Sequence, residues 1–138
     1  MKVTKEFVFD AAHYLPNYEG KCERLHGHTW KLQVTVDAPL DGPSGLAFDF
    51  VKLKNLTMDR VVNRLDHQVV NDVVANPSAE LIALWTWHQL RELPLFEVKV
   101  WETPTSFASC FAADYAAWTP PTEPAAVRTR EEHVRAGR

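Results

Sequence analysis

The sequence predicts an α+β domain, an antiparallel four-stranded sheet with two helices on one face. Three observations lead to this prediction. Two stretches near the N-terminus alternate apolar and polar side chains, two later stretches space their apolar side chains as helices do, and alternation returns after the second helix. At 138 residues the chain is long enough for one domain with a single core.

Two long strands open the chain. In residues 5–13 and again in residues 26–36, apolar side chains occupy every second position, as in a half-buried strand. The apolar face of the first strand carries Phe7, Phe9, Ala11 and His13. That of the second carries His26, His28, Trp30, Leu32, Val34 and Val36. A turn-rich stretch over 38–45 follows, and we expect a short strand over 46–50 and antiparallel pairing of the long strands.

Two helices come next. Residues 52–65 contain neither Gly nor Pro, and their apolar side chains recur at helical spacing. The dipeptide Asn76-Pro77 is typical of a helix start, because Asn can cap the free N–H groups and Pro suits the first helical position. This second helix is expected to run to about Leu93, since Pro94 ends it.

Two strands and a tail complete the chain. The strand over 96–102 places Phe96, Val98, Val100 and Glu102 on one face. Residues 107–118 supply the last strand. From residue 119 onward proline and arginine are frequent and apolar residues are rare. We therefore predict one folded domain over 1–118 and a flexible tail over 119–138.

Composition and charge exclude several classes of function. Lys and Arg number 15 against 18 Asp and Glu, a net charge of −3, and without a basic stripe the sequence predicts no nucleic-acid partner. The longest uncharged apolar-rich stretch, 81–90, is far shorter than the roughly 20 residues of a membrane-spanning helix. The opening MKVTKEF lacks the apolar region of a signal peptide, which favours a cytoplasmic protein that contacts no membrane. In that compartment Cys22 and Cys110 are expected to be free thiols.

Three histidines form the pattern with most chemical information. In a strand, residues i and i+2 point to the same side, so His26 and His28 can offer two imidazoles to one ion, and Gly27 allows close backbone approach. His13 ends the neighbouring strand on its apolar face and can supply a third. Three neutral imidazoles with an open fourth position describe a catalytic zinc site. Two alternatives stay open: the histidines are ordinary core or surface residues, or Cys22 is a fourth ligand of a structural site.

Cys22 and the pair Asp66-His67 are candidates for proton transfer. Cys22 lies in a polar loop just before the histidine strand, where a bound dication would favour its thiolate; the alternative is a bystander thiol. Cys110, by contrast, is expected to be buried in an apolar strand. The Asp66 carboxylate can fix the tautomer of His67 and raise its basicity. Neighbouring side chains diverge on a helix, so the pair couples only if the chain leaves the helix here.

Glu102 stands where the apolar face of its strand should continue. Burying a carboxylate there costs several kcal/mol unless it meets hydrogen-bond donors. One suitable partner is the planar, amidine-like edge of a heterocycle, which can donate two parallel hydrogen bonds. The alternative is an exposed glutamate at the end of the strand.

Five motifs follow one another along the chain. They are His13, Cys22-x-x-x-His26-Gly-His28, Leu65-Asp66-His67, Asn76-Pro77-Ser78-x-Glu80 and Trp101-Glu102-Thr103. In this order and spacing, over about residues 5–115, they resemble the 6-pyruvoyltetrahydropterin synthase and 6-carboxytetrahydropterin synthase family. The segments CERLHGH and LDHQVVND are most similar to the bacterial 6-carboxytetrahydropterin synthase branch.

The resemblance implies a fold, an assembly and a metal. The fold is the tunnelling fold, in which such units close into a barrel, commonly a homo-oligomer of six chains arranged as two trimers with active sites between subunits. The metal is zinc, held by His13, His26 and His28.

The resemblance also implies catalytic roles. Cys22 is the catalytic thiolate, and Asp66 and His67 form the acid/base pair. Glu102 anchors the amino-pyrimidine edge of the pterin.

The implied substrate is a small-molecule pterin, 7,8-dihydroneopterin triphosphate. The products are 6-carboxy-5,6,7,8-tetrahydropterin, acetaldehyde and triphosphate, a step toward queuosine or another deazapurine. The triphosphate needs cations, and we expect Lys21 and Arg24 to supply them. The alternatives are the pyruvoyl-forming enzyme, which eliminates triphosphate and keeps the carbon chain, and a non-catalytic, zinc-stabilised oligomerisation module.

Overall fold

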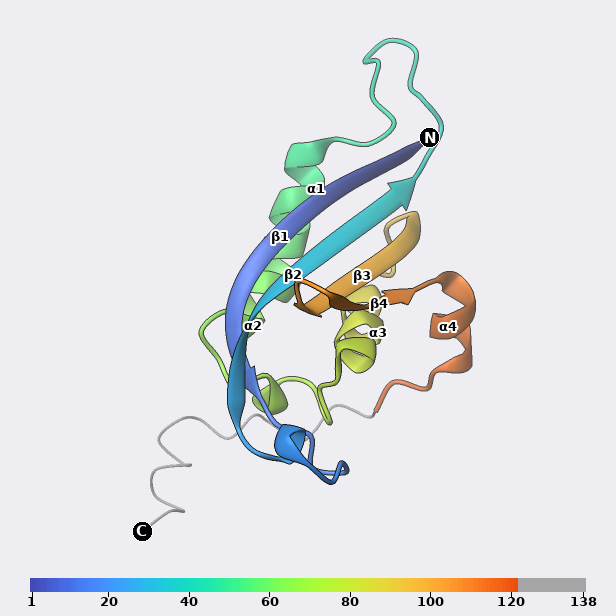
Figure 1. Ribbon diagram of the computed structural model, residues 1–138. Helices are drawn as coiled ribbons and strands as arrows, with labels where there is room; N and C mark the ends of the chain where they lie inside the picture. Colours follow the sequence, from blue (N-terminus) through green and yellow to red (C-terminus); the bar gives the residue numbers. More distant parts are fainter. Residues whose placement is uncertain (122–138) are drawn as a thin grey trace.

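The chain folds as an antiparallel sheet flanked by helices (Figure 1). The computed structural model describes residues 1–121. Within these residues the strands lie in chain order as β1 (Lys2–His13), β2 (His26–Asp37), β3 (Leu95–Thr103) and β4 (Ser106–Cys110). The helices are α1 (Phe50–Thr57), α2 (Asn63–Leu65), α3 (Ala79–Gln89) and α4 (Ala112–Ala117), with a π-helical turn Met58–Val62 and short 3-10 turns Lys21–Glu23 and Val70–Asp72. The predicted α+β class with a four-stranded antiparallel sheet is confirmed. None of the helices in residues 1–121 has the length and apolarity needed to cross a bilayer.

The register of the first two strands determines where the histidines lie. β1 and β2 pair along their full length as the predicted hairpin, and the pairing ends with His13 opposite His26. His28 lies opposite Ala11 in the same register. Because successive side chains of a strand alternate between the two faces, the three histidines share one face at one end of the sheet.

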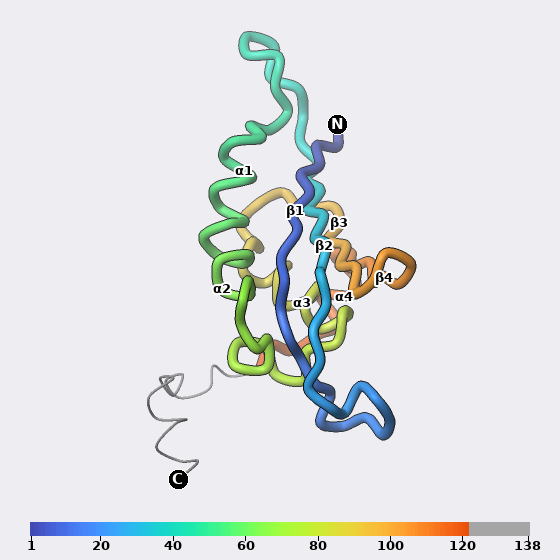
Figure 2. Tube along the Cα trace, turned by 60° about the vertical axis from the view of Figure 1, so that its left-hand side comes forward, coloured from blue at the N-terminus to red at the C-terminus, as the bar shows by residue number. Residues whose placement is uncertain are grey.

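The apolar face of the sheet packs against the helices to form the core. The strands contribute Phe7, Phe9, Trp30, Leu32, Val34, Val36, Val98 and Val100. The helical segments contribute Leu53, Val61, Leu65, Ile82, Ala83 and Trp87. Helices α1 and α2 contact β1, and α3 contacts β3 and β4, so these helices cover the same face of the sheet (Figure 2). The predicted placement of the helices on one face is correct.

The strand expected over 46–50 is wrong. Residues 38–49 form a loop that extends beyond the end of the sheet, and Phe50 begins α1 (Figure 1). The Asp49 carboxylate accepts a hydrogen bond of 2.8 Å from the backbone N–H of Val51 and thereby caps the helix. This cap favours a helix start where three alternating apolar residues alone suggest a strand.

Helix α3 starts later and ends sooner than the sequence predicts. Its N-cap is Ser78 rather than Asn76, and the Ser78 hydroxyl accepts a hydrogen bond of 3.2 Å from the Leu81 N–H. Asn76 instead adopts the left-handed backbone conformation, with φ of 49°, which Asn tolerates better than most residues. The helix ends at Gln89. The Asn76-Pro77 dipeptide is therefore a turn that leads into the helix.

Residues 107–118 hold the end of a strand and a helix instead of one strand. β4 ends at Cys110, and α4 follows directly. The Asp114 carboxylate accepts a hydrogen bond of 2.8 Å from the Phe111 N–H, which favours the helix start in an alanine-rich segment. The predicted flexible tail over 119–138 lies outside the described residues from residue 122 onward.

Candidate metal centre and active site

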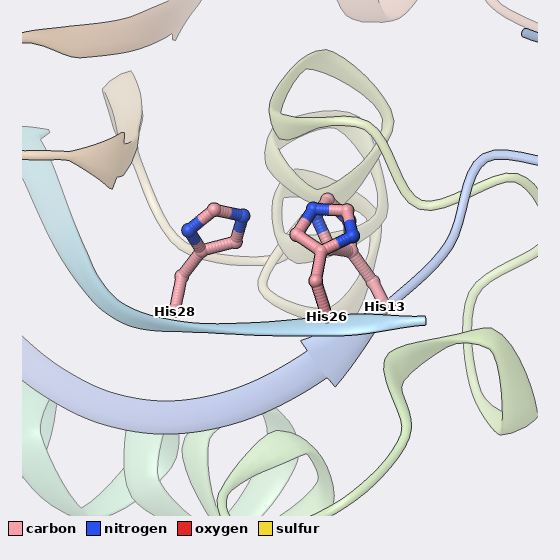
Figure 3. Close-up of side chains that lie close together, drawn as sticks. All are labelled: His13, His26 and His28. Carbon is pink, nitrogen blue, oxygen red and sulfur yellow. The ribbon is translucent and has the colours of Figure 1, made fainter. Parts of the chain in front are cut away.

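Three imidazoles meet where β1 ends and β2 begins (Figure 3). One ring nitrogen each of His13, His26 and His28 lies within 4.8 Å of those of the other two. The ring centroids are 4.5 Å apart for His13 and His26, 4.8 Å for His26 and His28, and 5.1 Å for His13 and His28. The structure thus brings together the three histidines that the sequence pattern predicts as ligands.

Backbone carbonyls orient two of these rings. The Nδ1 atom of His13 lies 2.8 Å from the Pro77 carbonyl oxygen, and the Nδ1 atom of His26 lies 2.6 Å from the Arg24 carbonyl oxygen. Because a carbonyl can only accept, each Nδ1 carries the proton and donates it, which leaves Nε2 with a free lone pair. Contacts of this kind are usual for metal-binding histidines.

Burial favours the neutral form of two imidazoles. His13 is fully buried, and burial lowers its pKa against the opposing effects of the Pro77 carbonyl and the Glu102 carboxylate. Burial also lowers the pKa of His28. The Nε2 atoms of His13 and His28 are buried without a hydrogen-bond partner among residues 1–121. Buried polar atoms seldom stay unpaired, and a metal ion that prefers imidazole ligands, such as zinc, would pair both. The residues therefore fit a metal ion.

Glu102 lies beside the histidines. Its Oε1 is 3.6 Å from Nε2 of His28 and its Oε2 is 3.9 Å from Nε2 of His13, distances too long for hydrogen bonds. The side chain is 27% exposed. It continues the apolar face of β3, since Val100 on that face lies opposite the buried Leu32 of β2. The carboxylate is therefore close to two of the histidines and still partly exposed, so it can meet a cation or a pair of donors.

The loop between β1 and β2 carries the other residues predicted nearby. Cys22 is half-buried, and its carbonyl oxygen accepts a hydrogen bond of 2.8 Å from the Leu15 N–H. Its thiol does not belong to the histidine group of possible ligand atoms, which disfavours a four-ligand site that includes Cys22. Lys21 and Arg24 are exposed on this loop. Arg24 contacts the site through its backbone, because its carbonyl orients His26.

Asp66 and His67 are in contact because the chain leaves the helix at this point, which is the condition expected from the sequence for their coupling. Helix α2 ends at Leu65, and the chain turns so sharply that His67 has a φ of 59°. The Asp66 Oδ1 atom lies 2.9 Å from Nδ1 of His67 and accepts a hydrogen bond of 3.0 Å from the Asp10 N–H. The His67 N–H donates to the Asp10 carbonyl at 2.7 Å. The carboxylate can therefore fix the tautomer of the imidazole.

Within residues 1–121 of one chain, this pair and the histidine site are separate groups. Asp10, which contacts the pair, lies opposite Thr29 in the register, on the sheet face away from His13. The His67 side chain is 78% exposed, whereas His13 is fully buried. The two groups of possible ligand atoms accordingly share no member. A single chain does not bring the predicted acid/base pair to the predicted metal ligands.

A cavity of about 550 Å³ opens beside the histidines. Most of its lining comes from the ends of β2 and β3 and includes His28, Glu102, Lys31 and Trp101, and β1 adds Val8. Of the three histidines, His28 is the one that lines it. Cavities of this volume are typical of small-molecule sites. Two of the lining residues, His28 and Glu102, are those predicted to bind a metal and a heterocycle.

Two groups that shape this site were not predicted. The Pro77 carbonyl lies 64 residues from His13 along the chain, and no local spacing rule relates the two. Trp30 packs against His13 and His28. This contact could have been predicted from the sequence, because Trp30 follows His28 by two residues and therefore lies on the same face of the strand.

Known proteins with related sequences share this arrangement of the chain. The family described as 6-pyruvoyl tetrahydropterin synthase matches residues 2–113. The chain is 41% identical over 119 residues to a 6-carboxy-5,6,7,8-tetrahydropterin synthase of Synechocystis sp., which covers 80% of this chain and 92% of that protein. It is 39% identical over 99 residues to a dihydroneopterin monophosphate aldolase of Pyrococcus furiosus, over 68% of this chain and 82% of that protein. A solved structure of the 6-pyruvoyl tetrahydropterin synthase of Caenorhabditis elegans has the same fold, with a TM-score of 0.74 at 24% identity over 81% of this chain and 95% of that chain.

Proposed function

Because the chain belongs to the 6-pyruvoyl tetrahydropterin synthase family, we propose that it is a zinc-dependent lyase acting on 7,8-dihydroneopterin triphosphate. The products are 6-carboxy-5,6,7,8-tetrahydropterin, acetaldehyde and triphosphate, and the step serves queuosine or another deazapurine pathway. One observation carries the proposal. Three imidazoles, two of them with a tautomer held by a backbone carbonyl, converge beside Glu102 and a cavity of small-molecule size.

The three histidines would hold the metal. Held there, a zinc ion would supply Lewis-acid chemistry, which polarises a substrate oxygen and lowers the pKa of a bound hydroxyl. Neutral imidazoles are the form that binds a metal, and the lowered pKa values of His13 and His28 keep these two neutral. A set of three protein ligands, as these histidines would provide, is typical of catalytic zinc sites, in which substrate or water takes the remaining position.

Glu102, Cys22 and His67 act on the substrate itself. The two oxygens of Glu102, which lines the cavity, accept parallel hydrogen bonds from the amino-pyrimidine edge of the pterin. The thiolate of Cys22 takes a proton from the substrate side chain. Asp66 holds the ring of His67 through Nδ1, so its Nε2 is the atom that exchanges protons.

A neighbouring copy of the chain completes each site. The Asp66-His67 pair and the metal ligands form separate groups in one chain, so the pair acts on the site of an adjacent subunit. The outer strands β1 and β4 leave sheet edges that neighbouring copies can close, and a six-chain barrel with sites between subunits satisfies both requirements. Lys21 and Arg24, both exposed on the loop beside the site, bind the triphosphate.

Three alternatives differ in their products. The pyruvoyl-forming reaction eliminates triphosphate and keeps the carbon chain, so it yields no acetaldehyde. The relative named dihydroneopterin monophosphate aldolase raises a second candidate, cleavage of the monophosphate instead of the triphosphate. A zinc-stabilised oligomerisation module turns over neither compound.

Turnover by purified, zinc-loaded protein distinguishes these reactions. With 7,8-dihydroneopterin triphosphate we expect acetaldehyde together with 6-carboxy-5,6,7,8-tetrahydropterin, identified by mass spectrometry. A pyruvoyl product without acetaldehyde would assign the first alternative, and cleavage of the monophosphate alone would assign the second. A zinc-loaded oligomer that consumes neither would indicate the module. The His28→Ala protein, which lacks one ligand, is the matched control and should be inactive.

A further inference from the structure

Trp30 is a large, fully buried side chain that contacts the metal site. Its exposed fraction is 0%. The indole meets the ring of His13 edge-on, with centroids 4.8 Å apart and planes at 84°, and meets that of His28 in the same way at 5.3 Å and 82°. Both imidazoles therefore rest against one aromatic side chain.

The indole is itself held on two sides. Its Nε1–H donates a hydrogen bond of 3.1 Å to the carbonyl of Ala11, which lies opposite His28 and two residues before His13. Its plane stacks on Phe9, with centroids 6.2 Å apart and an interplanar angle of 8°. The ring cannot turn without breaking a buried hydrogen bond, so it offers the imidazoles a fixed surface.

His28 depends most on this surface. Backbone carbonyls orient the rings of His13 and His26 through Nδ1. The ring of His28 is oriented by aromatic contacts, and it lies edge-on against Trp30. It is also edge-on to the rings of His13 and His26, which Figure 3 draws beside it. Its buried Nε2 is one of the atoms that a metal ion would pair.

We propose that Trp30 is a positioning residue for the metal centre. It fixes the rings of His13 and His28 so that their Nε2 atoms face a common point, and it excludes water from the side of the site that faces the core. The inference rests on the metal-binding role of the histidines in the proposed function. Groups that orient metal ligands typically change metal affinity roughly 10- to 100-fold.

The test compares two variants with a control of the same residue type. Trp30→Leu removes the aromatic edges, and Trp30→Phe keeps an aromatic ring but removes the hydrogen bond to Ala11. Trp87→Phe is the control, because Trp87 is a core residue of α3 that stacks on Tyr115. For each metal-free protein we would measure unfolding by denaturant, zinc affinity by competition with a chelating dye, and the visible spectrum of the Co²⁺-loaded form.

The expected result is a loss of affinity specific to Trp30. Trp30→Leu should bind zinc roughly 10- to 100-fold more weakly and change the Co²⁺ spectrum, Trp30→Phe should show a smaller change in the same direction, and Trp87→Phe should match the wild-type protein. If Trp30→Leu has the zinc affinity and Co²⁺ spectrum of the wild-type protein, even with lower stability, then Trp30 is only a core residue and the proposal is wrong. If Trp30→Leu does not fold, unchanged affinity and spectrum in Trp30→Phe would overturn the proposal equally. A wild-type protein that binds no zinc would instead overturn the metal site, and with it this inference.

Discussion

Replacement of Cys22 by alanine should separate catalysis from metal binding. The backbone carbonyl of Cys22, and not its side chain, ties the loop to the end of β1 through the Leu15 N–H at 2.8 Å. The substitution keeps this contact. The thiol lies outside the group of histidine nitrogens that can bind one ion. The variant should therefore fold and retain about one zinc ion per chain, the content of a site with three imidazole ligands.

The expected change lies in the rate. A positioned proton-transfer group contributes about 10²- to 10⁴-fold, or about 2.7 to 5.5 kcal/mol of activation free energy, so kcat should fall by a factor in that range. The effect on folding is small by comparison. Cys22 is half-buried, and loss of one such atom costs less than about 1 kcal/mol of the free energy of unfolding.

Cys110 provides the matched control for this experiment. It is buried in β4, and burial raises the pKa of its thiol to about 11, so the thiol stays protonated at neutral pH. Cys110→Ala should keep both zinc and turnover and lose only some stability. Elemental analysis and acetaldehyde release under single-turnover conditions give the two readouts. Full activity in Cys22→Ala refutes its catalytic role, and loss of zinc from that variant makes Cys22 a fourth ligand.

Four further outcomes follow from the site and the fold. His26→Ala and His28→Ala should each lose most of the zinc by elemental analysis, whereas His88→Ala, a substitution on α3 outside the histidine group, should retain it. The free energy of unfolding of the metal-free protein should fall as the pH drops below about 6.5, because the unfolded histidines then bind protons while the lowered pKa values of His13 and His28 keep the folded ones neutral. Each of the two histidines contributes at most about 1.4 kcal/mol per pH unit. Equal stability at pH 7.5 and 5.5 in denaturant titrations would contradict this. Asn76→Gly should preserve stability and zinc affinity, because glycine accepts a φ of 49°. Asn76→Val should lower the free energy of unfolding by about 1 to 2 kcal/mol and weaken zinc binding, because it displaces the Pro77 carbonyl that orients His13. Denaturant titration measures the first effect and dye competition the second. Light scattering should report a multiple of the 15.7 kDa chain, six copies on the proposed assembly, and a fully active monomer would be inconsistent with it.

The parts of the fold that follow from local periodicity were predictable. Side chains alternate with a period of two on any strand, so the apolar faces of β1, β2 and β3 could be assigned from the sequence. Two errors arose where a hydrogen-bonded cap overrides a short apolar pattern. Asp49, inside the segment 46–50, caps the helix that begins at Phe50, and the Asp114 carboxylate favours a helix start within 107–118. Both aspartates can be recognised in the sequence as capping residues, but the three or four apolar residues beside each of them favoured the prediction of a strand.

The residues of the site that follow from local spacing could be predicted in the same way, whereas contacts set by tertiary packing could not. His26 and His28 were predictable as a pair because they are two residues apart on one strand, and Glu102 because it interrupts an apolar face. The contact of the Pro77 carbonyl with His13 depends on where the turn before α3 meets the end of β1. Packing of the core sets that distance, and spacing along the chain contains no information about it.

Burial explains why two groups with similar ligand types differ in chemistry. Asp10, Asp66 and His67 also place possible ligand atoms within 4.8 Å of one another. One oxygen of each carboxylate already has a partner, however. Asp66 Oδ1 binds both His67 Nδ1 and the Asp10 N–H, and Asp10 Oδ1 accepts a hydrogen bond of 2.5 Å from the Thr29 hydroxyl. A metal ion would have to compete with these bonds and with water at an imidazole that is 78% exposed. The buried, unpaired Nε2 atoms of His13 and His28 gain most from a metal. An exposed imidazole held by a carboxylate is suited to proton exchange, in the proposed assembly with a substrate bound to another chain.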